Sequence, residues 1–260
     1  MARRIDDTGF GGLRIIQETE LFCYGVDAVI LAEAALEEAE QAKRVCDLGS
    51  GNGIIPLILG RCTERPEIIG VELLEENVDL ARESAEINGL GERVEFICQD
   101  VRDIPSISGG KSGKLGKGSF DVVTMNPPYI KASRGIVSDD DRQATARHET
   151  RGSLKDFMEA GEYLLKTGGS LFMINRPGRL VDMMELGRTL GLEPKVLRLI
   201  AGKKGEKPAL ILVRFKKQGG ENLEIPPEWA IREENGDYTP ELIGVHERIK
   251  AKANNNGGTK

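Results

Sequence analysis

Short apolar runs with strand character alternate with longer segments of helical spacing through most of this chain. Because parallel strands need a crossover connection, most often a helix, this alternation predicts an α/β fold with a mostly parallel sheet and helices on both faces. Only a short loop separates the last two runs, so we expect them to pair as an antiparallel hairpin. The seven predicted strands cover residues 44–48, 67–71, 93–97, 120–125, 170–175, 195–200 and 209–215.

The 260 residues suffice for one large domain with a core of its own. We predict a single domain over residues 1–250, made of an N-terminal cap segment (1–43), a core (44–217) and a C-terminal extension (218–250). Residues 251–260 are rich in Asn, Gly and Lys, and are predicted to form a disordered tail.

Capping residues mark several helix starts. Asp27 is well placed as the N-cap of a helix that ends near Gln41, and Ser153 as the N-cap of a later helix. Pro177 suits the first turn of a further helix, which ends at Gly191.

Composition narrows the possible functions. With 39% hydrophobic and 30% charged residues, and no apolar run of membrane-spanning length, we expect a globular protein without a membrane partner. Residues 1–7 are too polar for the core of a signal peptide, so a cytoplasmic location is expected. The four cysteines form no C-x-x-C pair, and no metal site is predicted.

Charge is unevenly distributed over a chain whose net charge is −6. Residues 105–155 hold nine basic and five acidic side chains, and residues 195–217 hold eight and one. The Gly- and Lys-rich stretch 105–119 is predicted to be a flexible basic loop. A basic face on an acidic protein is compatible with a polyanionic partner, and equally with an ordinary solvated surface.

The glycine-rich turn Asp47-Leu48-Gly49-Ser50-Gly51-Asn52-Gly53 joins a predicted strand to a helix. Glycines allow a sharp turn and the close approach of a ligand to free N–H groups at a helix N-terminus. Dinucleotide sites need G-x-G-x-x-G, whereas the spacing here is G-x-G-x-G, followed by Ile54. An acid before the first glycine would repel a pyrophosphate, and suits a ligand with an ammonium group, such as the methionine part of S-adenosylmethionine.

Carboxylates also end the next two predicted strands. Glu72 lies 19 residues after Gly53, where it can accept from both hydroxyls of a ribose. Asp100, followed by Val101, is placed to accept from an adenine amino group. Ordinary polar strand ends are the alternative interpretation.

The tetrapeptide Asn126-Pro127-Pro128-Tyr129 follows the apolar run 120–125. Prolines lack a backbone N–H, fix φ and restrict the preceding residue, so the strand must end at Met125. A stiff turn then presents one amide and one aromatic ring, which suits the recognition of a flat group. A strand stopped by prolines with a surface tyrosine is the alternative.

Together, these motifs resemble the class I S-adenosylmethionine-dependent methyltransferases, and the tetrapeptide is similar to that of their amino-group-methylating branch. The resemblance covers about residues 20–215 and implies a Rossmann-like fold with S-adenosyl-L-methionine as cofactor. It further implies that the Asn126 side chain and the Pro127 carbonyl accept the two N–H bonds of an exocyclic amine. Tyr129, beside Pro128, would stack on the target plane.

Several further segments carry a finer resemblance, namely residues 22–31, 176–180, 193–195, 207–209 and 235–239. They are similar to segments of the bacterial tRNA1(Val) adenine N6-methyltransferases, which act beside the anticodon of a valine tRNA. This resemblance implies adenine N6 in a tRNA anticodon loop as the target. It also implies contact of Tyr24 and Asp27 with the cofactor, for which aromatic packing and a helix cap are the alternative.

The polar connection 130–152 contains three further candidate substrate-binding residues. Arg147, His148 and Arg151 would contact phosphates beside a base splayed out of the loop, with a solvated loop as the alternative. The loop lysines and the basic cluster at 195–217 would then steer RNA toward the site.

Other functions remain open. Glutamine N5-methylation of a protein release factor uses the same tetrapeptide, but those enzymes carry a helical N-terminal domain and only 46 residues precede Asp47 here. Ribosomal RNA guanine N2-methyltransferases more often end the tetrapeptide in Phe. A catalytically inactive cofactor-binding module is the alternative that is not an enzyme, and the glycine spacing disfavours a nicotinamide oxidoreductase.

Overall fold

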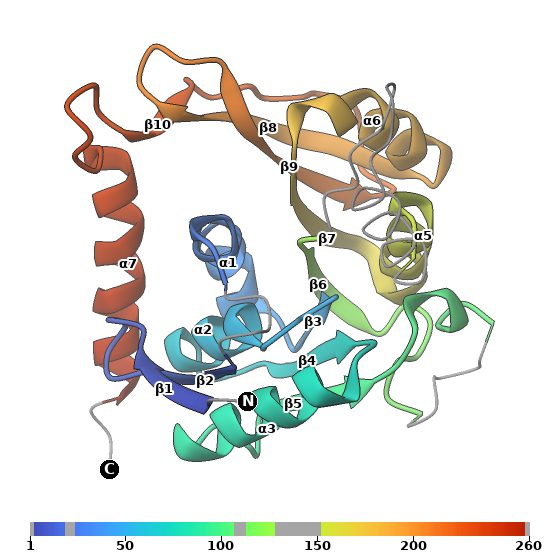
Figure 1. Cartoon of the computed structure of the whole chain (residues 1–260). Helices are drawn as coiled ribbons and strands as arrows, with labels where there is room; N and C mark the ends of the chain where they lie inside the picture. The colour runs from blue at the N-terminus through green and yellow to red at the C-terminus, as the bar shows by residue number, and fades with distance from the viewer. Residues whose placement is uncertain (1–2, 19–23, 107–112, 128–151, 258–260) are drawn as a thin grey trace, which may run out of the picture.

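A computed structural model describes residues 3–18, 24–106, 113–127 and 152–257 of the chain. Its centre is an eight-stranded sheet in the order β10-β8-β9-β7-β6-β3-β4-β5 (Figure 1). The strands β3 to β7 run parallel, and β9 is antiparallel to both of its neighbours, which confirms the predicted α/β sheet. The strand bounds are β3 (Arg44–Leu48), β4 (Glu67–Glu72), β5 (Val94–Cys98), β6 (Phe120–Met125), β7 (Leu165–Asn175), β8 (Leu192–Lys203), β9 (Pro208–Lys217) and β10 (Trp229–Arg232).

Helices cover both faces of the sheet (Figure 1). An apolar core lies between the sheet and the helices on each face. One face carries α1 (Val26–Gln41), α2 (Ile54–Cys62), α3 (Glu75–Ile87) and α7 (Pro240–Gly257). The opposite face carries α5 (Leu154–Leu164) and α6 (Leu180–Thr189). Two short 3-10 turns, η1 (Val101–Asp103) and η2 (Pro177–Arg179), follow β5 and β7. Pro177 opens η2 immediately before α6, close to its predicted place.

The sheet has one strand more than predicted. The additional strand, β10, comes from the C-terminal extension and pairs with β8, with Trp229 opposite Ile200. A run of four residues is too short for a recognisable alternation of apolar and polar side chains. Its place is set by burial instead, because the side chains of Trp229 and Ala230 enter the core.

A separate hairpin precedes the sheet. It consists of β1 (Arg3–Asp7) and β2 (Arg14–Glu18), and neither strand was predicted. The reason is that β1 is charged and largely exposed, so it carries little apolar signal. On β2, Ile15 and Ile16 are buried, and the Ile16 backbone N–H donates to Ser84 Oγ of α3 at 2.9 Å.

Two predicted helix caps have different outcomes. The N-cap predicted at Asp27 is wrong, because α1 begins at Val26 with Gly25 as its N-cap and Asp27 lies inside the first turn. The N-cap predicted at Ser153 is confirmed. Its hydroxyl accepts from the backbone N–H of Asp156, whose carboxylate accepts in return from the Ser153 N–H at 2.7 Å.

The disordered tail predicted from residue 251 is also wrong as far as residue 257, because α7 continues to Gly257. The prediction relied on the Asn-rich composition of this end. The helix nevertheless continues through it, because an apolar stripe on α7 extends to Ala253 and packs on the rest of the protein. The buried members of that stripe are Leu242, Val245, Ile249 and Ala253. Gly11 packs so closely on this stripe that an added Cβ would lie 2.8 Å from the Cβ of Ala253.

We predict that Ala253→Asp lowers the free energy of unfolding by about 3 kcal/mol, because it buries a carboxylate against the β1–β2 connection. Ala251→Asp is the matched control, since Ala251 is exposed on the same helix and should change stability by less than about 1 kcal/mol. Urea unfolding of both variants measures the difference. Equal stability of the two would contradict the packing of this helix end.

Candidate active site

A cavity of about 430 Å³ lies at the carboxyl ends of the parallel strands, which is where open α/β sheets bind ligands. The register Leu48–Met125 between β3 and β6 puts the residues that follow, Gly49 and Asn126, at the same level. The cavity is lined by the start of α1, by the turns that follow strands β3 to β6, and by α5. The lining residues are Tyr24, Gly25, Asp27, Ala28, Gly49, Ser50, Gly51, Asn52, Ile54, Ile55, Val71, Glu72, Leu73, Asn77, Gln99, Val101, Asn126, Pro127 and Phe157.

The glycine-rich turn forms one wall, and its glycines serve different purposes. All three have left-handed backbone conformations, with φ of +72°, +54° and +84° at Gly49, Gly51 and Gly53. A Cβ on Gly51 would meet no atom within 4 Å, so this backbone is open to a ligand. A Cβ on Gly53 would lie 2.6 Å from Phe96, so this glycine is required for packing.

Glu72 is held in place by backbone donors. One carboxylate oxygen accepts from the Gly51 N–H and the other from the Leu74 N–H, both at 3.0 Å. The turn after β3 and the turn after β4 are therefore joined through one side chain that lines the cavity.

Asp47 lies behind the glycine turn and is only 1% exposed. One of its oxygens accepts from Thr124 Oγ1 at 2.6 Å, while Oδ2 has no hydrogen-bond partner among the described residues. Burial raises the pKa of Asp47 to about 7, with the Thr124 hydrogen bond opposing the shift and Glu72 adding to it. A buried carboxylate oxygen without a partner favours a cationic group beside it.

Asn126 ends β6 and lines the cavity together with Pro127. Its side-chain Nδ2 donates to Asp27 Oδ2 at 3.1 Å, although 99 residues separate the two in the chain. The other carboxylate oxygen, Oδ1 of Asp27, accepts from the Ala28 backbone N–H at 3.0 Å. Tyr24 and Asp27 therefore both reach the cavity, and Asp27 contacts Asn126 directly.

Asp100 does not line the cavity. Its carboxylate pairs with the Arg102 side chain, and this hydrogen bonding lowers the pKa of Asp100. The neighbouring Gln99 and Val101 line the cavity instead. Gln99 is 1% exposed, and its Oε1 has no hydrogen-bond partner in the described part of the chain.

Sequence reasoning missed Gln99, Ser50 and Phe157. Gln99 and Ser50 are sequence neighbours of the predicted acids and glycines, but their residue types gave no separate signal. Only the fold shows that Ser50 Oγ and Gln99 Oε1 are buried at the cavity without hydrogen-bond partners among the described residues. Phe157 comes from α5, where its spacing predicts no more than a core position.

Several candidates lie outside the described residues, namely Pro128, Tyr129, Arg147, His148 and Arg151. The basic cluster at 195–217 lies wholly within the described residues, and half of its eight basic side chains are paired with carboxylates. Lys204 pairs with Glu233, Arg214 and Lys216 with Glu38, and Lys217 with Glu162. This pairing reduces the charge that the cluster can offer to a polyanion.

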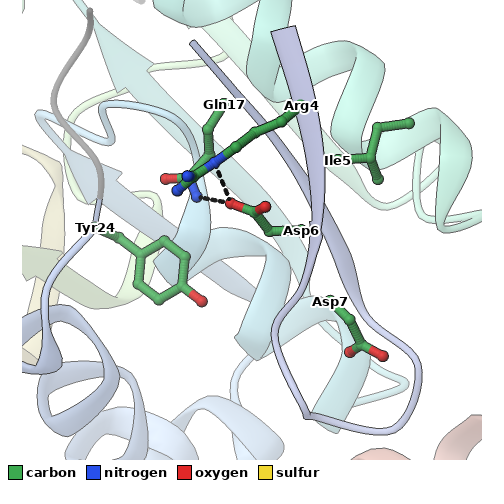
Figure 2. Close-up of a pocket in the computed structure, with 6 residues that line it drawn as sticks. All are labelled: Arg4, Ile5, Asp6, Asp7, Gln17 and Tyr24. Carbon is green, nitrogen blue, oxygen red and sulfur yellow. Dashed lines mark hydrogen bonds and ion pairs between the residues drawn. The ribbon is translucent and has the colours of Figure 1, made fainter. Parts of the chain in front are cut away.

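A second, more open cavity of about 540 Å³ adjoins the first at Tyr24. In it, Asp6 Oδ2 accepts from Arg4 and from Gln17 Nε2, at 2.8 and 2.6 Å (Figure 2). Gln17 Oε1 also accepts from Asn52 Nδ2 of the glycine-rich turn at 3.1 Å. The β1–β2 hairpin therefore supports the turn that lines the first cavity.

A family model described as a methyltransferase domain matches residues 39–187, more than half of the chain. The chain belongs to this methyltransferase family. Solved structures show the same fold: a predicted O-methyltransferase from Agrobacterium tumefaciens has a TM-score of 0.67 at 22% identity, and covers 86% of this chain and 96% of its own. A SAM-dependent methyltransferase from Aquifex aeolicus has a TM-score of 0.51 at 16% identity, with coverages of 74% and 89%.

Curated relatives bear a more specific name. A Bacteroides fragilis protein named tRNA1(Val) (adenine(37)-N6)-methyltransferase is 27% identical over 192 residues, which are 74% of this chain and 76% of the relative. A protein of the same name from Pasteurella multocida is 28% identical over 227 residues, with coverages of 85% and 86%.

These findings confirm a Rossmann-like class I methyltransferase with S-adenosyl-L-methionine as its cofactor. The residues of the site fit that group. Asp47, just before the glycine-rich turn, has a buried oxygen without a hydrogen-bond partner among the described residues. The backbone at Gly51 is open, and the fixed carboxylate of Glu72 lines the cavity. Within the described ranges, no helix combines the length and apolar character needed to cross a bilayer, and no three His, Cys, Asp or Glu side chains are grouped to hold a metal ion.

The raised pKa of Asp47 predicts a pH-dependent stability. Because the carboxyl is more readily ionised in the unfolded chain than in the fold, the contribution of Asp47 to stability is highest below its unfolded pKa of 3.8 and falls as pH rises toward about 7. Without cofactor, the wild type should lose about 2–3 kcal/mol relative to Asp47→Asn between pH 5 and pH 8. Denaturant unfolding at both pH values measures this, and a constant difference would contradict the buried, unpaired carboxylate.

Gln99 has a buried acceptor oxygen at the cavity, which predicts a hydrogen bond between Gln99 and the ligand. Gln99→Leu should weaken S-adenosylhomocysteine binding about tenfold, since one hydrogen bond to a buried acceptor is worth about 1–2 kcal/mol. Asp100→Asn should weaken it less, because Arg102 already engages that carboxylate. Titration calorimetry measures both, with the unfolding midpoint without ligand as the control for folding. Normal binding by Gln99→Leu beside a large loss in Asp100→Asn would assign the contact to Asp100.

Proposed function

We propose that this methyltransferase transfers a methyl group to N6 of an adenine in the anticodon loop of a tRNA. The observation that carries the proposal is that Asn126 and Pro127 line the same cavity as the glycine-rich turn. The names of relatives at 25–28% identity support tRNA adenine as the target. The resemblance of residues 22–31 to the opening segment of such enzymes supports it further.

The residues of the turns after β3, β4 and β5 would hold the cofactor, which supplies a methyl group on a sulfonium centre. Asp47 would face its ammonium group, and the glycine-rich turn would lie against it, with Gly49 and Gly53 on either side of the open backbone at Gly51. Glu72 would accept from the ribose hydroxyls. Val101 and Tyr24, which line the cavity, complete the proposed cofactor contacts.

The chain needs no strong base for this reaction. We assign to the Asn126 side-chain oxygen and the Pro127 carbonyl the two N–H bonds of the target amine. Accepting both bonds localises the nitrogen lone pair, which is otherwise delocalised into the ring. The amine becomes strongly acidic once it is methylated, so positioning and preorganised dipoles carry the rate.

An adenine must leave its stack to enter a cavity of this kind, and anticodon loops offer unpaired bases. Tyr129, beside Pro128, would stack on the flipped base. Arg147, His148 and Arg151 would contact the adjoining phosphates. Because half of the 195–217 cluster is paired with carboxylates, these three are the stronger candidates for tRNA contact.

We predict that Asn126→Ala lowers kcat by about 10²-fold or more, in line with the loss of one preorganised polar partner of the reacting group. Asn235→Ala, at an exposed asparagine after β10, is the control and should keep wild-type activity. The assay uses labelled cofactor and tRNA that lacks the modification, followed by nucleoside mass analysis. Full activity of Asn126→Ala would refute the mechanism, and N2-methylguanosine or methylated protein as the product would refute the substrate.

A further inference from the structure

The orientation of the Asn126 amide is set by a residue from a distant part of the chain. Nδ2 of Asn126 donates to Asp27 Oδ2 at 3.1 Å, and both residues line the cavity. An ionised carboxylate can only accept hydrogen bonds, so the amide nitrogen must face Asp27. The amide oxygen then lies on the side away from Asp27.

Asp27 is itself held in a defined position. Its Oδ1 accepts from the Ala28 N–H at 3.0 Å, which leaves Oδ2 directed at Asn126. Gly25 provides the room for this arrangement, because a Cβ at residue 25 would lie 2.5 Å from Asp27 Oδ1. The backbone of Gly25 is extended, with φ of −105°, a conformation open to any residue. The absence of a side chain therefore serves the carboxylate and not the backbone.

We propose that Asp27 is a positioning residue that orients the Asn126 amide, so that its oxygen and not its nitrogen meets the target amine. The proposal rests on the function proposed above. Turned by half a rotation, the amide would confront the amine with N–H donors, and no hydrogen bond would form. The carboxylate prevents this rotation and, through the amide dipole, increases the electron density on the accepting oxygen.

Two other roles for Asp27 make different predictions. An N-cap role is excluded by the position of Asp27 within the first turn of α1. Direct binding of the cofactor would make a substitution of Asp27 weaken cofactor affinity. A positioning role instead lowers kcat while the dissociation constant for the cofactor stays nearly unchanged.

The experiment compares four variants in kcat for tRNA methylation and in Kd for S-adenosylhomocysteine. Asp27→Ala removes the acceptor, and Gly25→Ala displaces the carboxylate without removing it. Both should lower kcat about tenfold or more and change Kd less than about threefold. Asp27→Asn keeps the size of the side chain but has a single acceptor oxygen. Because the Ala28 N–H engages that oxygen, the new NH₂ group would face the NH₂ of Asn126, and kcat should fall as it does in Asp27→Ala. Glu37→Ala, an exposed acid on α1, is the control and should match the wild type.

Two results would overturn the proposal: a wild-type kcat in Asp27→Ala or Asp27→Asn, or a rise in Kd that parallels the loss of kcat. A substrate-free readout separates this proposal from the proposed function. The side-chain NH₂ signal of Asn126, assigned by its absence in Asn126→Ala, should shift in Asp27→Ala and Gly25→Ala. If the wild type methylates no tRNA, the function fails, and an unmoved NH₂ signal would refute the positioning role independently.

Discussion

The parallel pairing of β3 with β6 determines where the chemistry of this methyltransferase takes place. Asp47 lies opposite Thr124, and Leu48 opposite Met125, so the glycine-rich turn and Asn126 leave the sheet side by side. A shift of one residue in this register would reverse the direction of every following side chain. The hydrogen bond from Thr124 Oγ1 to Asp47 links the same two strands just beneath the cavity.

The carboxylate of Asp47 also couples the stability of the fold to ligand binding. Asp47 is buried in the core, where one oxygen accepts from Thr124 and the other has no hydrogen-bond partner within the described part of the chain. Such burial destabilises the ligand-free fold at neutral pH. A cationic ligand group beside it would offset this unfavourable burial, and binding to the folded state alone would raise stability by mass action. The buried Asp47 therefore lowers the stability of the ligand-free protein, and binding of a cationic ligand would raise it again.

Much of the fold could be predicted from sequence because the decisive signals are local. The strand 120–125 is predicted correctly because two prolines end it, and the helix after Ser153 because a serine suits its N-cap. What failed depended on partners distant in the chain. The end of α7 is ordered by packing against Gly11, and β10 by pairing with β8. The pairing of the basic cluster with Glu38, Glu162 and Glu233 likewise follows only from the three-dimensional structure.

The same distinction applies within the site. Glycines, strand-end carboxylates and the tetrapeptide are recognisable by residue type and spacing, whereas the contact of Asp27 with Asn126 depends on how α1 lies across the sheet. Ile30 and Leu31, one turn after Asp27, are buried in the core formed with β6 and β7. The packing that places α1 thus also fixes the distance between the carboxylate and the amide. The hydrophobic core therefore sets the direction of a polar group that lines the cavity as well as stabilising the fold.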